Sequence, residues 1–396
     1  MRLDAERWSQ RRGVARILDA LGGGEGLTRY VGGAVRDELL QIPVNDIDFA
    51  TRLHPDEVVA RLEAARIKAV PTGIAHGTIT AVADGQPAEV TTLRADVSTD
   101  GRRATVEFSD DWQADAARRD FTINALYADP VTGEIFDYFG GLDDLKTRHV
   151  RFIGNPLQRI AEDHLRILRF FRFHARFGVG AMDSAALEAC TIRANDLMAL
   201  SRERIADETV KTLAIADPVV TVSLMVERGI FAPVVPEITD ASRLAALVVD
   251  EAAAGIAADP IRRLASLLPQ DPDVADTVAV RLRFSKKARK RLAAAAEPDL
   301  AANPRALAYW SGTETAIDRL LLAGQPTAAA AIASWPRPRL PISGGRLIKL
   351  GLTEGPAVAT ALKAIDRAWV AAGFPDGAEW DALVAAQLAA SRHIRN

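Results

Sequence analysis

Gly-Gly-Ala-Val-Arg-Asp at residues 32–37 and Asn-Asp-Ile-Asp-Phe at residues 45–49 are the two stretches of sequence that decide the fold. In the second stretch, Asp46 and Asp48 stand two positions apart. On a β-strand such residues point to the same face, so both carboxylates emerge together while the apolar residues that alternate with them are buried. Two carboxylates on one face can hold two Mg²⁺ ions.

The glycine-rich stretch predicts the start of a helix that binds phosphate. Its two glycines precede a segment with apolar side chains at Val35, Leu39 and Leu40, and such a turn exposes backbone N–H groups to a triphosphate. Arg36 adds a guanidinium fork at the same place. Alone, either stretch is typical of a surface turn or a linker. Together and in this order they indicate metal-assisted nucleotidyl transfer.

Length and composition exclude several classes of protein. A chain of 396 residues is too long for one compact core, so we expect two to four domains. With 49 basic and 52 acidic residues, the net charge of −3 creates no global attraction to nucleic acid, and any RNA contact must come from local basic patches. The single Cys190 excludes a disulfide framework, and the lack of an apolar signal core or membrane span predicts a cytoplasmic location.

The sequence changes character near residue 150. After it, the chain is rich in Ala, Leu and Arg with helical spacing, and Asp-Pro and Asn-Pro pairs are interpreted as helix stops. Before it, short β-rich runs alternate with turns, at residues 29–31, 46–50, 78–83, 88–93, 105–108 and 135–139. Residues 78–93 predict a hairpin closed around Asp84-Gly85. On its second strand Glu89 alternates with apolar residues, and it is either a third metal ligand or a strand surface residue.

A second motif, Arg-Arg-Asp-Phe-Thr-Ile-Asn-Ala-Leu, occupies residues 118–126. Its adjacent arginines can clamp phosphates, and Asp120 and Asn124, four residues apart, are expected to cap or brace the helix that carries them. An ordinary helix start with charged residues is equally compatible.

Residues 94–103 are polar, basic and contain a glycine, with Arg102 and Arg103 at their end. This composition predicts a mobile loop that can swing over a substrate, although a plain solvated loop fits as well.

Residues 159–173 predict a helix whose charged residues recur every third position. Asp163, Arg166, Arg169 and Arg172 form a spiral stripe that rises about 13 Å at 1.5 Å per residue, the length of a nucleotide from base to phosphates. The stripe is expected to meet an anion, because most of the remaining circumference is apolar.

The first two members of this stripe predict base selection. Asp163 accepts hydrogen bonds and Arg166 donates them, which matches the amine and ring nitrogen that cytosine and adenine present side by side. Uracil and guanine present the reverse polarity. The alternative is a salt-bridged surface, because Glu162 and Arg166 stand four residues apart in the favourable order.

With these motifs the chain resembles class II tRNA nucleotidyltransferases, the family of bacterial CCA-adding enzymes and poly(A) polymerases. Residues 32–48 resemble the first motif of the family and residues 118–125 the second. Three further motifs follow in order, at residues 137–145, 162–172 and 201–208, where Ser201 is expected to cap a helix.

The resemblance implies an α+β fold. We expect a small polymerase-β-like nucleotidyltransferase head with a mixed sheet at residues 1–150. A helical neck for nucleobase recognition at 151–215, a helical RNA-binding body at 216–335 and a helical tail at 336–396 are expected to follow.

The resemblance also implies a reaction and its residues. Asp46 and Asp48 would bind the catalytic Mg²⁺ ions, and the RNA 3′-hydroxyl would attack the α-phosphate of CTP or ATP. The nucleotide would be bound by Gly33, Arg36, Arg119, Asp163, Arg166, Arg169 and Arg172. The loop at residues 100–103 would help the change from CTP to ATP.

The helical remainder is expected to bind tRNA. Its densest basic run, residues 281–291, has seven Lys or Arg and includes Lys286, Lys287, Arg289 and Lys290. A solvated charged helix is nearly as compatible with this run. The sequence leaves open whether the enzyme adds CCA, adds only A, or makes poly(A), and an inactive RNA-binding protein is the alternative from another class.

Overall fold

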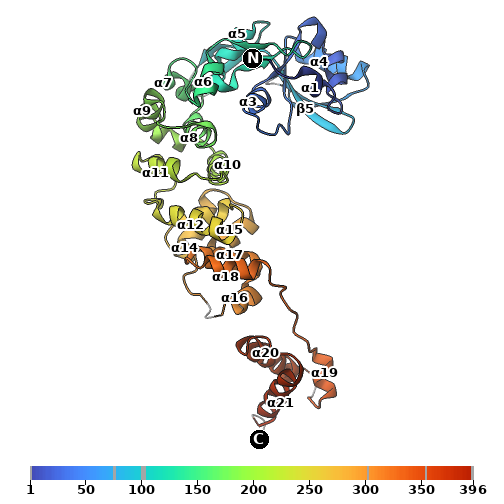
Figure 1. Ribbon diagram of the computed structural model, residues 1–396, viewed down its shortest axis with the longest axis vertical. Coiled ribbons are helices and arrows are strands. Elements are labelled where there is room, and N and C mark those ends of the chain that lie inside the picture. Colours follow the sequence, from blue (N-terminus) through green and yellow to red (C-terminus); the bar gives the residue numbers. More distant parts are fainter. Residues whose placement is uncertain (1, 75–76, 100–103, 301–302, 353–354, 394–396) are drawn as a thin grey trace. The chain divides into compact units, whose positions relative to one another are not determined.

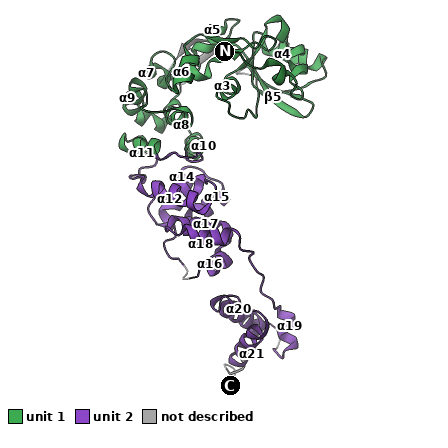
Figure 2. Cartoon of the chain, viewed as in Figure 1, with its two compact units in different colours: residues 1–212, 220–234 green, residues 213–219, 235–396 purple. Residues whose placement is uncertain are grey.

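The computed structural model describes residues 2–74, 77–99, 104–300, 303–352 and 355–393. The chain forms two compact units, which Figure 2 distinguishes by colour. Unit 1 comprises residues 1–212 and 220–234, and unit 2 comprises residues 213–219 and 235–396. The finer division into head, neck, body and tail stays a prediction.

A mixed β-sheet is the framework of the N-terminal part of unit 1 (Figure 1). Within the described residues its seven strands lie in the order β3-β4-β5-β2-β1-β8-β9. Strands β2 and β5 are parallel, whereas the neighbours on either side pair antiparallel. The strands are β1 (Thr28–Val31), β2 (Phe49–Thr51), β3 (Lys68–Gly73), β4 (Thr78–Ala83), β5 (Gln86–Thr92), β8 (Leu126–Ala128) and β9 (Ile135–Asp137).

The predicted hairpin at residues 78–93 is confirmed. Strands β4 and β5 pair in register from Thr78↔Thr91 to Ala83↔Gln86, which leaves Asp84 and Gly85 as a two-residue turn. Both turn residues have positive φ angles, 53° and 80°, as a type I′ turn requires.

Two expectations for the sheet region were wrong. Asp46 and Asp48 lie just before β2 rather than on it, although they still alternate with the buried Ile47 and Phe49. Part of the expected loop at residues 94–103 is a strand, β6 (Arg94–Thr99), which pairs with β7 (Ala104–Phe108). These two strands form a separate two-stranded sheet.

The second motif does not lie on a helix. Helix α5 (Trp112–Ala117) ends before it, and the motif continues through the 3₁₀ turn η3 (Thr122–Asn124) into β8. Asp120 and Asn124 therefore brace a turn and not the expected helix: Asn124 Nδ2 donates to Asp120 Oδ1 over 2.9 Å. Here the pairing of β8 with both β1 and β9 prevails over local helical spacing.

The helix expected at residues 159–173 is broken. Helix α7 (Pro156–Glu162) ends just before Asp163, whose φ of −151° and ψ of 106° are extended. Helix α8 (Arg166–Phe177) begins three residues later. The prediction of a continuous stripe of charges is therefore wrong. Asp163 lies in the break, and Arg166 is the first residue of the second helix.

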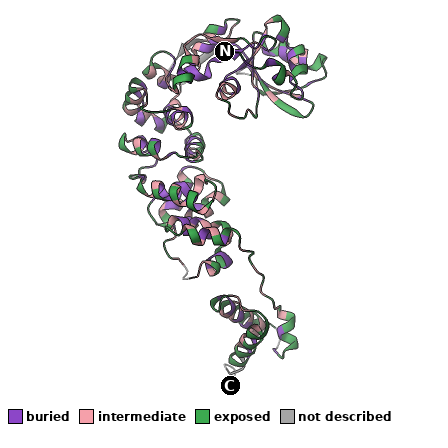
Figure 3. Ribbon diagram, viewed as in Figure 1, coloured by how far each residue is buried: buried purple, intermediate pink, exposed green. Residues whose placement is uncertain are grey.

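An aromatic core holds α8 against the second motif. Phe121 contacts Phe152, Phe170 and Phe173 with ring centroids 5.0, 6.4 and 4.9 Å apart. Phe170 and Phe171 are fully buried on this helix, and buried residues recur along it in Figure 3. This packing places the charged face of α8 next to the second motif.

The other helices of this part of the chain surround the sheet or extend from it. They are α1 (Ala5–Ser9), α2 (Val14–Ala20), α3 (Gly33–Leu39), α4 (Pro55–Ala64), α6 (Gly141–Thr147), α9 (Ser184–Ile192), α10 (Arg202–Leu213) and α11 (Val219–Glu227), with 3₁₀ turns η1 (Gly23–Glu25) and η4 (Ala194–Ala199).

The described parts of residues 235–396 contain helices and no strand. Several Asp-Pro and Asn-Pro pairs begin helices here rather than stop them, because the Asp or Asn caps the helix and Pro takes its first position, as at Asp259, Asp271 and Asn303. The helices are α12 (Ser242–Ala254), α13 (Pro260–Leu267), α14 (Pro272–Arg281), α15 (Lys286–Ala295), α16 (Pro304–Ser311), α17 (Thr313–Leu322), α18 (Pro326–Ala333), α19 (Gly344–Lys349), α20 (Pro356–Ala371) and α21 (Gly377–His393).

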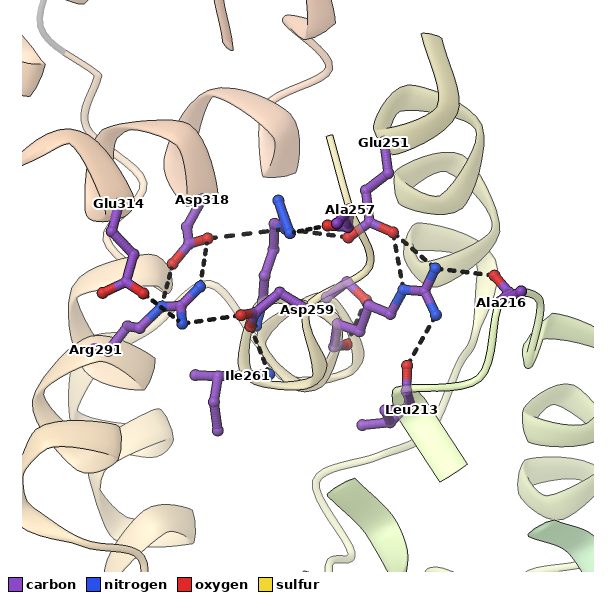
Figure 4. A network of polar contacts seen from close by, with 12 residues as sticks. Leu213, Ala216, Glu251, Ala257, Asp259, Ile261, Arg291, Glu314 and Asp318 are labelled. Atoms are coloured by element: carbon purple, nitrogen blue, oxygen red, sulfur yellow. Dashed lines mark hydrogen bonds and ion pairs between the residues drawn. The ribbon is translucent and has the colours of Figure 1, made fainter. Parts of the chain in front are cut away.

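A buried ionic network lies inside unit 2 (Figure 4). Glu251 accepts from Arg262 and Arg263, and all three side chains are at most 3% exposed. Arg263 also donates to the carbonyls of Leu213, Ile215 and Ala216. These bonds attach residues 213–219 to this unit. In the described residues, no helix has the length and apolar character needed to cross a membrane.

Candidate nucleotide-binding and catalytic site

A cavity of ≈ 490 Å³ brings the glycine-rich turn, the second motif and the break between α7 and α8 together. Its walls are both basic and acidic, and one aromatic ring lines it. The lining residues are Gly32, Gly33, Arg36, Arg118, Arg119, Asp120, Asn124, Asp163, Arg166, Arg169 and Phe173. Six of the seven residues that were expected to hold the nucleotide are among them; Arg172 is not.

The glycine-rich turn has a backbone conformation that depends on glycine. Gly32 has a φ of 68° and a ψ of −125°, a region that other residues rarely adopt. A Cβ atom there would also lie 3.3 Å from Arg119 Nη1. The turn therefore lets the Arg119 guanidinium approach the backbone at the start of α3.

Arg36 is buried under this turn instead of reaching freely into solvent. Its Nε donates to Asp37 Oδ1 over 2.8 Å, and its Nη1 donates to the side-chain oxygen of Asn124. Its guanidinium also lies 4.1 Å from the centre of the Phe177 ring. Burial lowers the pKa of Arg36, while the charge of Asp37 opposes that change.

Asp115 on α5 orients the two arginines of the second motif. It accepts from Arg118 Nε over 2.8 Å and from Arg119 Nη2 over 3.1 Å, and the Tyr127 hydroxyl donates to it over 2.7 Å. Burial alone would raise the pKa of Asp115, but the two guanidiniums and this hydroxyl hold it well below its usual range. Asp115 is thus a charged, buried anchor that the sequence did not reveal.

Asp163 and Arg166 line the same cavity, but each has its own partner. Arg204 Nη2 donates to both carboxylate oxygens of Asp163, over 3.1 and 2.8 Å. Arg166 Nη1 lies 2.6 Å from Glu162 Oε2, so the salt bridge considered as an alternative does form. Arg166 Nη2 donates to the Arg118 carbonyl over 2.9 Å. The carboxylate and the guanidinium are thus held in place by different groups.

The remaining arginines of α8 meet carboxylates of the protein itself. Arg169 Nε donates to Asp120 Oδ2 over 2.8 Å, and Arg172 Nε donates to Glu208 Oε2 over 2.6 Å. The anions that these arginines were expected to meet are therefore, at least in part, carboxylates of the protein itself. Arg169 still borders the cavity, whereas Arg172 faces Glu208 of the fifth motif.

The three predicted metal-facing carboxylates line a second cavity of ≈ 380 Å³, with Asp46, Asp48 and Glu89 in its wall. Burial, then the charges of Glu89 and Asp46, raise the pKa of Asp48 to about 6, and the charge of Arg119 partly offsets this. Arg119 thus lines the nucleotide cavity and its charge also acts on Asp48.

The carboxylates fit a divalent cation. Asp48 is half-buried and Asp46 and Glu89 are exposed, but the charges of these two carboxylates disfavour the charged form of Asp48. A bound cation would offset that repulsion, and hard oxygen donors are the ligands that Mg²⁺ prefers. In the described stretches, no three acidic, His or Cys side chains are drawn together tightly enough to form a ready-made metal site. The role of Glu89 as a third ligand therefore stays a prediction.

Asp48→Asn should stabilise the protein in the presence of a chelator. The folded pKa of about 6 exceeds the usual 3.8, so the charged carboxylate opposes folding above pH 6, and this effect disappears as the pH falls towards 3.8. We expect a gain of about 2–3 kcal/mol at pH 8 and about 1 kcal/mol at pH 4.5, measured by urea unfolding. Asp56→Asn, at an exposed site on α4, is the control. A gain in the free energy of unfolding that does not change with pH would contradict the raised pKa of Asp48.

The predicted RNA contacts have a mixed outcome. Arg102 and Arg103 lie outside the described residues. On α15, Lys286, Lys287 and Lys290 are exposed, whereas Arg289 forms an ion pair with Asp276. The basic run is therefore partly neutralised, and RNA binding by these residues stays a prediction.

Comparison with known proteins identifies the family. Residues 28–151 match the poly(A) polymerase head domain, and residues 181–242 match a probable RNA and SrmB-binding site of polymerase A. The chain is 36% identical over 368 residues to mitochondrial CCA tRNA nucleotidyltransferase 1 of Mus musculus, covering 87% of this chain and 83% of that protein. This chain belongs to the CCA tRNA nucleotidyltransferase family.

Other relatives of this nucleotidyltransferase agree with that assignment. A CCA-adding enzyme of Anoxybacillus flavithermus is 40% identical over 205 residues, covering 51% of this chain and 50% of that one. The Bacillus stearothermophilus CCA-adding enzyme in complex with CTP has a similar structure, with a TM-score of 0.70 at 25% identity, covering 97% of this chain and all of that one. The α+β fold with a nucleotidyltransferase head is thereby confirmed.

Several site residues escaped the sequence analysis. Asp115, Arg204 and Phe173 were not identified as functional, although the first two position Arg119 and Asp163 and the third lines the cavity. Arg204 belongs to the fifth motif, so its position in that motif was the available signal. Nothing in the sequence near Asp115 distinguishes it from an ordinary helix residue.

Proposed function

We propose that this protein adds C, C and A to the 3′ ends of tRNA, using CTP and ATP. The observation that carries the proposal is the cavity in which Asp163 and Arg166 lie beside Gly33, Arg36 and Arg119. One wall offers a carboxylate and a guanidinium to a base, and the other offers donors to a triphosphate. The names of the mouse and bacterial relatives support the same activity.

Asp163 and Arg166 would read the base by hydrogen-bond polarity. The Asp163 carboxylate would accept from the exocyclic amine of C or A, and Arg166 would donate to the adjacent ring nitrogen. Arg204 orients the carboxylate without burying it, since the Asp163 side chain is 35% exposed. Glu162 orients the Arg166 guanidinium, whose side chain is more deeply buried than that of Asp163.

Asp46 and Asp48 would serve the chemical step. Bound divalent ions, which we propose to be Mg²⁺, would supply Lewis-acid activation of the RNA 3′-hydroxyl and stabilise the leaving pyrophosphate. The two aspartates would hold these ions, with Glu89 as a further ligand in the same cavity. Arg36 and Arg119 would bind the triphosphate and fix the α-phosphate for in-line attack.

The parts of the chain would divide the work. We assign catalysis to the head at residues 1–150, nucleobase recognition to the neck at 151–215, and tRNA binding to the helical body at 216–335. Support for this division comes from the two family matches, which cover residues 28–151 and 181–242 separately.

We also propose that the protein works in the cytoplasm. Its one cysteine, Cys190, is free and buried, which agrees with a reducing compartment. The mouse, human and zebrafish relatives are named as mitochondrial proteins, so cell fractionation with an antibody against the chain is the appropriate test.

The test is stepwise addition to defined tRNA ends. Transcripts that end before CCA, after the first C and after CC are each incubated with CTP alone or ATP alone. We expect CTP to extend the first two and ATP to extend only the third. Extension of all three by ATP would instead favour a poly(A) polymerase, and ATP addition without any CTP addition would favour an A-adding enzyme.

Asp163→Ala should relax base selection. Without the carboxylate, Arg166 remains as a donor and the preference for an exocyclic amine is lost, at about 1–3 kcal/mol of selectivity. We expect measurable incorporation of UTP and GTP in competition with CTP and ATP. Arg172→Ala is the comparison, because Arg172 faces Glu208 and does not line the cavity. An active Asp163→Ala enzyme with unchanged preference would show that the base is read elsewhere.

A further inference from the structure

Thr80 on β4 lines the cavity of the three predicted metal ligands, Asp46, Asp48 and Glu89, which we call the carboxylate cavity. Thr80 and Glu89 are direct partners in the antiparallel pairing of β4 with β5, so their side chains project from the same face of the sheet. The residues on either side of Thr80 in β4 are fully buried on the opposite face. The Thr80 hydroxyl is therefore on the side of the sheet that carries Glu89.

The sheet fixes the position of the Thr80 hydroxyl. Strand β4 pairs with β3 on one side and with β5 on the other, and a β-branched side chain has few rotamers on such a strand. Thr80 Oγ1 also lies 3.0 Å from Thr72 Oγ1 on β3, and the two hydroxyls share a hydrogen bond. Because a hydroxyl donates once and accepts twice, Thr80 keeps hydrogen-bonding capacity for a ligand, and its side chain is partly exposed.

The lining of the carboxylate cavity is suited to a sugar. Among the residues that the structure describes, no Lys or Arg lines this cavity, whereas arginines line much of the nucleotide cavity. Carboxylates repel phosphate groups unless a cation lies between them, but they accept hydrogen bonds from sugar hydroxyls directly. The volume of ≈ 380 Å³ falls in the range of about 300–1,000 Å³ that is typical of sites for small ligands.

The proposed reaction brings a ribose to this cavity. The 3′-hydroxyl of the RNA end must reach Asp46 and Asp48 and the ions that they would hold. The 2′-hydroxyl lies on the neighbouring carbon of the same ribose, and it both donates and accepts hydrogen bonds, as a threonine hydroxyl does. Within the described part of the cavity wall, Thr80 is the one residue with a side-chain hydroxyl.

We infer that Thr80 binds the 2′-hydroxyl of the 3′-terminal ribose of the RNA that is being extended. This inference rests on the proposed function. The contact makes the enzyme prefer an RNA end to an otherwise identical end that lacks this hydroxyl. The incoming CTP or ATP carries the same hydroxyl on its own ribose, and the experiment separates these two sources.

The experiment is a double-mutant cycle between protein and RNA, in the full-length protein. Wild type and Thr80→Val each extend two tRNA transcripts that lack CCA, one with ribose and one with 2′-deoxyribose at its last nucleotide. Thr80→Val removes the hydroxyl and keeps the branched shape, whereas Thr80→Ser keeps the hydroxyl. Thr78→Val is the matched control, because Thr78 lies on the same strand and face, pairs with Thr91 over 3.4 Å and does not line the cavity.

For the wild type, we expect kcat/KM to be about three- to tenfold lower with the deoxyribose end than with the ribose end, the contribution of one hydrogen bond. Thr80→Val should lose the same factor on the ribose end and nothing further on the deoxyribose end. Thr80→Ser should restore most of the preference, and KM for CTP should stay within twofold of wild type. Filter binding of the two transcripts without CTP should show the same loss of preference, in a measurement that involves no chemistry.

A Thr80→Val enzyme that prefers the ribose end as strongly as the wild type does would overturn the inference. A wild type that extends both ends equally well would do the same, as would a Thr80→Val defect no larger than that of Thr78→Val. A defect confined to KM for CTP would also overturn it, because the hydroxyl would then serve the incoming nucleotide. A wild type that cannot extend even the ribose end would overturn the proposed function as well.

Discussion

Asp46→Asn and Asp48→Asn should each reduce incorporation of both CTP and ATP by roughly a thousandfold or more, because losing a metal ligand removes about 4 kcal/mol or more of transition-state stabilisation. The substitutions keep the shape of the side chain and remove its charge. The two aspartates line one cavity with Glu89 and do not line the nucleotide cavity, so CTP binding should change little.

Single-turnover assays with saturating tRNA and CTP measure this effect, and filter binding measures tRNA affinity in parallel. Asp56→Asn, at an exposed position of the same head, should retain wild-type rates. If either active-site variant kept more than about a tenth of the wild-type rate, well short of the expected loss, the metal assignment would be wrong.

Arg263→Ala should destabilise unit 2 by about 3–5 kcal/mol, because breaking a buried ion pair leaves an uncompensated charge and unpaired carbonyls. Arg263 is 2% exposed, and it bonds Glu251 and three carbonyls of residues 213–216 (Figure 4). Arg262 alone would remain beside Glu251.

Urea unfolding followed by tryptophan fluorescence suits this test, since Trp310, Trp335, Trp369 and Trp380 all lie in unit 2. Arg289→Ala is the matched control. It removes an arginine that pairs with Asp276 at the surface, and such exposed pairs contribute little. Near-identical unfolding of Arg263→Ala and Arg289→Ala would contradict the importance of the network.

Local rules predicted those parts of the site that short stretches of sequence determine. The hairpin at Asp84-Gly85 follows from turn chemistry, and the alternation of Asp46 and Asp48 with buried residues follows from extended backbone. The glycine at position 32 was likewise expected at a turn. In each case the responsible interactions lie within a few residues.

The break at Asp163 was not predictable from its own segment. Residues 159–173 keep helical spacing throughout and contain neither Gly nor Pro. The partners at the break come from afar: Asp163 binds Arg204, 41 residues later, and Arg166 donates to the carbonyl of Arg118, 48 residues earlier. Tertiary contacts thus override a local helical preference, and they do so where the base would be read.

The arginines of α8 show the same limit. Their position on an apolar helix correctly indicated that anions must meet them, but nothing local identified those anions as Asp120 and Glu208. Strand β8 was missed for a related reason, because its extended conformation depends on pairing with β1 and β9.

The sequence of the 3′ ends produced from a tRNA transcript that lacks CCA, with all four nucleotides at equal concentration, tests the central claim most directly. A single cavity that reads C and A through Asp163 and Arg166 predicts ends that stop at CCA, with U and G essentially absent. Runs of A without C, or ends containing U and G at the frequency of C and A, would contradict it.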